Sequence, residues 1–165
     1  MMQINSIFSA CDESLLEGKE LDFFEIEWYE SDKRILRKKT TKGVDIAIKR
    51  SIPLQPLLNN DILICEGQSA VLIAVKPCEC IVVFPRNAME IGTVCYDIGN
   101  KHIPVSLTEK EIVLPYDKPA FCLLEKNGFE LKVETRIFTN QLRHNIPQHA
   151  HQPDSFIDKL IKLTS

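Results

Sequence analysis

The feature that most constrains the fold is a helical pattern with clear start and stop signals near the middle of the 165-residue chain. Asn87 and Glu90 stand three residues apart just before an apolar run, an arrangement that caps helix N-termini. The apolar residues that follow recur at three- and four-residue steps, which predicts one buried helix face made of Ala88, Ile91, Val94, Cys95 and Ile98. Gly99 and Asn100 are predicted to end the helix.

Strands and a second helix are predicted around this first helix. Apolar runs and alternation indicate strands at 80–84, 103–107, 111–114 and 130–138. Asp117 is suited to cap a second helix, with Pro119 in its first turn and Gly128 after its end. The resulting order, β-α-β-β-α-β, is that of the ferredoxin-like fold.

The first part of the chain is predicted to be all-β. Apolar and charged residues alternate at 24–28 and 44–48, and turn signals lie at 41–43, 59–61 and 66–68. A small sandwich or barrel is the expected form. Lys76-Pro77 marks the expected boundary, because proline interrupts strands and stiffens linkers.

The last part of the chain holds three of the four histidines: His144, His149 and His151. Two prolines accompany them and no apolar period runs through the segment, which predicts a flexible tail. An apolar stripe at 155–163 predicts a short terminal helix. The predicted fold class is therefore α+β, with an all-β domain at 1–76, a ferredoxin-like domain at 77–138 and a histidine-containing tail at 139–165.

His102 is the remaining histidine, and it lies where the first helix has ended and a strand begins. Taken alone, that position favours a surface or hydrogen-bonded histidine without a metal role. However, Gly99-Asn100-Lys101-His102 followed by Ile103-Pro104 resembles a motif of the UreE family, the urease accessory proteins that act as nickel metallochaperones. Looser similarity to the amino-terminal domain of that family occurs at 27–30, 44–48 and 58–65, so the resemblance spans roughly residues 20–138.

The resemblance implies a function and a site. It implies a homodimer in which His102 of both subunits binds Ni(II) at the two-fold axis, and a tail whose histidines, His149, His151 and the more distant His144, also bind metal. This tail lacks the dense histidine run of many relatives, so bulk nickel storage is not expected. Lys118 lies where some relatives carry a further histidine, which argues against an additional internal site. The implied partners are the urease accessory GTPase and, through it, apo-urease, with the β domain binding protein partners.

The chemistry of nickel fits such an arrangement. Ni(II) is well served by neutral imidazole nitrogen, but one side chain leaves most of its coordination positions open. A two-fold axis brings two copies of one residue together, and tail histidines and water can complete the shell. Zn(II) and Cu(II) fit the same ligands, so selectivity must come from geometry or from delivery by a partner.

Other functions are less well supported by the sequence. The net charge of −3 gives no reason to expect nucleic acid, and six basic residues at 33–42 lack interleaved aromatic residues, so they are interpreted as a solvated hairpin face suited to an acidic partner. Neither a signal peptide nor a membrane span is recognised, and a cytoplasmic location is expected, with Cys65, Cys95 and Cys122 as buried free thiols. No catalytic motif emerges, so an enzyme is not expected.

Two alternatives remain open at this point. One is a protein-interaction adaptor in urease maturation with incidental metal binding. The other is a zinc or copper buffer that uses the tail and Cys78-x-Cys80, although four ligands are usual for structural zinc and no second cysteine pair is spaced to match.

Overall fold

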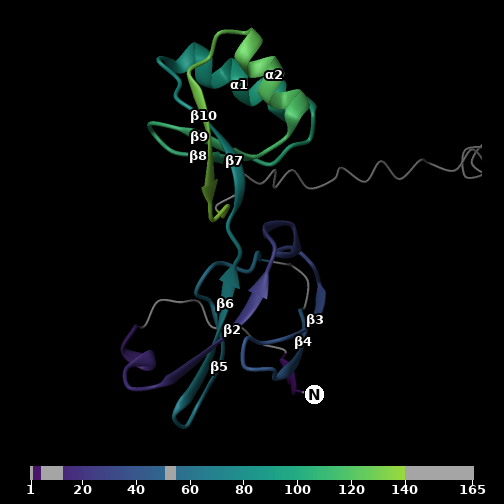
Figure 1. The fold of residues 1–165 in the computed structure, drawn as a ribbon, viewed down its shortest axis with the longest axis vertical. Coiled ribbons are helices and arrows are strands. Elements are labelled where there is room, and N and C mark those ends of the chain that lie inside the picture. Colours follow the sequence, from purple (N-terminus) through teal and green to yellow (C-terminus); the bar gives the residue numbers. More distant parts are fainter. Residues whose placement is uncertain (1, 5–12, 51–54, 140–165) are drawn as a thin grey trace, which may run out of the picture.

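The structure is a computed structural model that describes residues 2–4, 13–50 and 55–139 (Figure 1). Its strands are β1 (Met2–Ile4), β2 (Glu20–Ile26), β3 (Ile35–Lys39), β4 (Asp45–Lys49), β5 (Ile62–Glu66), β6 (Ser69–Val75), β7 (Cys78–Val83), β8 (Ser106–Leu107), β9 (Ile112–Pro115) and β10 (Leu131–Arg136). Its helices are α1 (Ala88–Asn100) and α2 (Lys118–Lys126), with 3-10 turns η1 (Glu13–Leu16) and η2 (Trp28–Glu30). The α+β class is confirmed. None of the described helices is long and apolar enough to cross a membrane.

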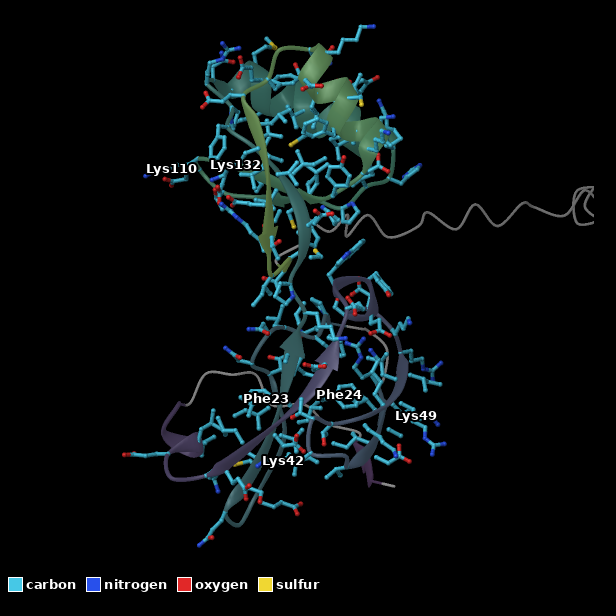
Figure 2. All side chains as sticks on the ribbon, in the orientation of Figure 1. Phe23, Phe24, Lys42, Lys49, Lys110 and Lys132 are labelled. Atoms are coloured by element: carbon cyan, nitrogen blue, oxygen red, sulfur yellow. The ribbon has the colours of Figure 1, made fainter. Side chains whose placement is uncertain are left out.

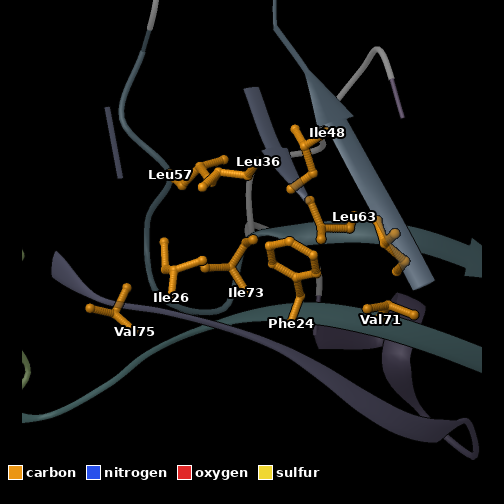
Figure 3. Packing of buried hydrophobic residues seen from close by; sticks show 10 residues of the cluster. Phe24, Ile26, Leu36, Ile48, Leu57, Leu63, Val71, Ile73 and Val75 are labelled. Atoms are coloured by element: carbon orange, nitrogen blue, oxygen red, sulfur yellow. The ribbon is translucent and has the colours of Figure 1, made fainter. Parts of the chain in front are cut away.

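The N-terminal strands form two three-stranded sheets, ordered β1-β4-β3 and β2-β6-β5. Alternate residues of both sheets point into one apolar core, in which Phe24 and Ile73 are fully buried and Leu36 and Ile48 nearly so (Figure 3). The prediction that Trp28 continues the strand pattern is wrong. It lies instead in η2, where Glu27 and Glu30 form a capping box that turns the chain.

The C-terminal strands form a single antiparallel sheet ordered β10-β7-β9-β8. Together with α1 and α2 they follow the predicted β-α-β-β-α-β order, and both helices lie at the same face of this sheet in Figure 1. The core between helices and sheet consists of Ile81, Val83, Val94, Ile98, Ile112, Leu114, Ala120 and Leu124. The expected caps are present: Asn87 accepts from the Glu90 amide at 2.9 Å, and Asp117 accepts from the Ala120 amide at 2.8 Å.

Two details of this region differ from the sequence-based expectation. Ala88 is exposed, so the buried face of α1 begins with Ile91 rather than at its first residue. The strand predicted at 103–107 is reduced to β8, because Ile103 still takes part in the helix cap and Pro104 has no amide hydrogen to give to a ladder.

The basic side chains of the β3–β4 hairpin are largely exposed, as predicted, and Figure 2 shows Lys49 at the outer side of the hairpin. Lys38 is an exception, because it is half-buried against Glu30 and hydrogen-bonds to that carboxylate. Lys33 donates a second bond to Glu30 at 3.2 Å. Whether this face meets an acidic partner stays a prediction.

Glu30 is expected to make the stability of the protein depend on pH. Burial by itself raises the pKa of this carboxyl, but hydrogen bonds from Lys38, the Glu27 amide and Lys33 outweigh it and lower the pKa from 4.5 to about 2. A lowered folded-state pKa stabilises the fold at neutral pH, and that stabilisation is lost as pH falls from about 4.5 to about 2. Glu30→Gln should therefore lower the free energy of unfolding at pH 7 by about 2–3 kcal/mol.

Urea denaturation from pH 7 down to pH 2 measures this difference, which should shrink toward zero at the acid end. Glu25→Gln is the matched control. The Glu25 carboxylate is half-exposed and lies 3.9 Å from the Lys76 amine, and such exposed ion pairs contribute little to the free energy of unfolding. If Glu30→Gln lowers the free energy of unfolding by the same amount at every pH, the lowered pKa of Glu30 does not stabilise the fold.

Candidate metal site

The backbone around His102 closes the end of α1. The His102 amide donates to the Gly99 carbonyl at 3.0 Å, and the Ile103 amide donates to the Ile98 carbonyl at 3.3 Å. This pair of bonds is the Schellman arrangement, in which the residue after the helix adopts a left-handed conformation. That residue is His102, with φ of 56°, and not Gly99 as the sequence suggested. Ile103 packs on the cluster that contains Ile98, which supplies the apolar contact typical of this cap.

The left-handed conformation is unusual for histidine at this position. Glycine is the residue that most often occupies it, because any Cβ is crowded when φ is positive. The free-energy cost is of the order of 1 kcal/mol or more, and a strained residue of this kind points to a function for its side chain. Apart from Asn60, His102 is the sole non-glycine residue with positive φ among the described ones.

The His102 side chain is exposed, while the backbone that carries it is fixed. The next residues, Ile103 and Val105, are half-buried against the core between helices and sheet. An imidazole on a fixed backbone with its ring open to solvent is accessible to a metal ion and to a second protein chain.

One chain does not provide a complete ligand set within its described part. No group of three or more His, Cys, Asp or Glu that would hold a metal ion occurs among residues 2–4, 13–50 and 55–139. The predicted ligands His144, His149 and His151 lie outside the described residues, as does the predicted terminal helix. Of the four predicted histidines, His102 is the one that lies in the described part of the chain.

A row of exposed side chains on α1 leads to His102. Met89, Thr93, Tyr96 and Asn100 recur at steps of four, three and four, so they share one side of the helix, here called the α1 stripe. Met89 is 79% exposed and Tyr96 is 71% exposed. Large apolar side chains so exposed are typical of a protein-binding surface. The sequence could have revealed this stripe, because Met89 and Tyr96 are large side chains on the helix side opposite the buried Val94 and Ile98.

Proteins of known family resemble this chain along most of its length. A family model described as the C-terminal domain of the UreE urease accessory protein matches residues 78–157. The urease accessory protein UreE of Flavobacterium johnsoniae is 38% identical over 155 residues, which cover 93% of each chain. The UreE protein of Acetivibrio thermocellus is 36% identical over 136 residues, covering 82% of this chain and 88% of the relative. The chain belongs to the UreE family. It is therefore related to urease accessory proteins across most of its length.

The cysteines of this UreE chain only partly match expectation. The five described cysteines are free thiols, which was predicted for Cys65, Cys95 and Cys122. Cys65 and Cys95 are half-buried and Cys122 is exposed, so the prediction that these three are buried is wrong for Cys122. Its position on α2 faces solvent because Ala120 and Leu124 occupy the side that packs on the core. Burial raises the pKa of the Cys95 thiol, which therefore stays protonated at neutral pH.

Proposed function

We propose that this UreE family member is a nickel metallochaperone of urease maturation, and that it binds Ni(II) through His102 of two subunits. The observation that carries the proposal is the exposed His102 side chain on a left-handed backbone that glycine would adopt more easily. Retaining histidine there is understandable if its imidazole is needed. Neutral imidazole is a good ligand for Ni(II), Zn(II) and Cu(II), so nickel as the cargo is inferred from the family and not from the donor atoms.

The α1 stripe supports a homodimer with the two His102 residues near its axis. In an isologous interface the same surface of both subunits meets, so a residue near the axis lies near its own copy. Met89 and Tyr96 are apolar groups suited to the centre of such an interface. The stripe ends at Asn100, two residues before His102, so a two-fold axis near this end of the stripe brings the two imidazoles close together.

The rest of the chain is assigned by the same proposal. Residues 77–138 bind metal and dimerise, and the all-β part at 1–76 binds protein partners, among them the urease accessory GTPase in its complex with apo-urease. His149, His151 and His144 complete the nickel shell. A site partly built from tail residues holds its ion reversibly, as a carrier rather than an enzyme requires.

Calorimetric titration with nickel tests this function. The full chain should bind one Ni(II) tightly per two chains, and a form that ends at Thr139 should bind it more weakly but with the same ratio, since the two His102 ligands remain. A purified dimer that binds no nickel contradicts the proposal. If urease activation in cells survives loss of His102, the adaptor alternative is favoured instead.

A further inference from the structure

A pair of thiols lies on the sheet face opposite the helices, apart from His102. Cys78 and Cys80 are two residues apart on β7, so their side chains point to the same face of the sheet. Their sulfur atoms are 3.7 Å apart. Cys80 is fully buried and Cys78 is half-buried, so the pair is reached from solvent through Cys78.

Apolar and charged residues both surround the pair, because Glu134 and Arg136 of β10 lie directly across the sheet from Cys80 and Cys78. Cys80 belongs to a buried cluster with Val82, Val113 and Phe138, on which Trp28 and Cys78 also pack. The Trp28 and Phe138 rings meet edge to face with centroids 5.6 Å apart. The pair therefore lies between the N-terminal turn η2 and the segment after β10.

Burial and the neighbouring Cys78 thiol raise the pKa of Cys80 to about 12, while a backbone hydrogen bond and the charge of Arg136 act in the opposite direction. The backbone and the charge of Arg136, which pairs with Cys78 across β7 and β10, both favour the thiolate form of Cys80.

Strand geometry argues against a disulfide between these residues. Residues two apart on a strand have Cα atoms about 6.4–6.8 Å apart, from the rise of about 3.2–3.4 Å per residue. Disulfides span about 4.4–6.8 Å, so this pair is at the limit and a bridge would be strained and easily reduced. The stable form in a reducing compartment is the dithiol.

The number of ligands argues against zinc. Structural zinc takes four ligands, and no third His, Cys, Asp or Glu joins the two cysteines in the described part of the chain. Thiolates favour soft metal ions such as Cu(I). A soft cation that accepts two thiolates in a line needs no more ligands than this pair offers. We propose that Cys78 and Cys80 form a two-coordinate Cu(I) site, independent of the proposed nickel site.

Binding is an exchange of protons for the metal, with no change of oxidation state. Two S–H bonds break, two Cu–S bonds form, and two protons pass to the solvent, so one Cu(I) and two thiols give a bis-thiolate complex with one negative charge. Affinity should consequently rise with pH.

The test is an anaerobic competition for Cu(I) between the reduced full-length protein and bicinchoninate, whose Cu(I) complex is coloured. One Cu(I) per chain should leave the chelator, and the emission of Trp28, the one tryptophan of the chain, should change because its ring packs on the thiol cluster. Cys78→Ala should weaken Cu(I) binding by more than about 100-fold. Removing the hydrogen-bond partner of a ligand already lowers metal affinity by about 10- to 100-fold, and removing the ligand itself should lower it further.

Matched variants separate this site from the others. Cys122→Ala and Cys95→Ala, which remove an exposed and a half-buried thiol elsewhere, should bind Cu(I) like the unaltered protein. His102→Gly should also retain Cu(I), whatever it does to nickel. Copper X-ray absorption of the unaltered protein should show two sulfur neighbours, a result that does not depend on how well any variant folds. The proposal is overturned if Cys78→Ala binds Cu(I) unchanged, if copper has no sulfur neighbours, or if the protein takes no Cu(I).

Discussion

Replacing His102 by glycine is expected to abolish the tightest nickel-binding event while leaving the fold at least as stable. The variant removes the proposed ligand from both subunits at once. It also places at φ of 56° the residue that adopts this conformation most easily. Both hydrogen bonds of the cap, which backbone amides donate to the Gly99 and Ile98 carbonyls, remain in the variant. Nickel affinity should fall by more than about 100-fold, and the free energy of unfolding should be unchanged or rise by up to about 1 kcal/mol.

Two further variants separate the ligand role from the backbone role. His102→Asn keeps a residue that tolerates the left-handed conformation, so it should lose nickel and retain stability. His102→Ala should lose nickel and also keep the strain, so it should be less stable than His102→Gly. Calorimetry and thermal unfolding of the three proteins provide both readouts. If His102→Gly unfolds at a clearly lower temperature, the histidine is there for stability and the functional interpretation of its strain fails.

Replacing Tyr96 by arginine is expected to convert the proposed dimer into monomers. Tyr96 is 71% exposed on the α1 stripe, so its own chain loses little packing when it is changed. In a two-fold interface the change puts two like charges near each other, which costs several kcal/mol. The dissociation constant of the dimer should rise by more than about 100-fold, and tight nickel binding should fall with it, because the two His102 residues separate.

Sedimentation measurements over a range of protein concentrations determine the dimer constant. Tyr29→Arg is the matched control, since Tyr29 is 57% exposed in the N-terminal part, away from the α1 stripe, and its replacement should leave the dimer intact. A Tyr96→Arg protein that remains dimeric shows that subunits associate through another surface.

Local chemistry made the helices predictable from sequence. The caps at Asn87 and Asp117 are decided by side chains acting on amides three residues away, and both formed as expected. The β-α-β-β-α-β order then leaves few ways to arrange the C-terminal strands, because connections are short and neighbouring strands pair. His102 was proposed as a metal ligand from its motif, and this stays a prediction.

Features decided by contacts between distant residues were not predictable. The end of α1 is fixed by the packing of Ile103 near Ile98, and this contact lets the helix pass Gly99 and put His102 in the left-handed position. Trp28 lies in a turn and not in the predicted strand, and its ring contacts Phe138, which is more than a hundred residues further along the chain. No local pattern contains such a contact.

The most direct test of the shared site is nickel calorimetry on a heterodimer that pairs one unaltered subunit with one His102→Gly subunit, purified through two different affinity tags. If the two His102 residues bind one ion together, the heterodimer has half of the ligand pair, and the tight event should be lost or greatly weakened, nearly as in the double variant. If the heterodimer instead binds half the nickel of the unaltered dimer with the same affinity, each subunit binds nickel alone, and the account of His102 as a shared ligand is wrong.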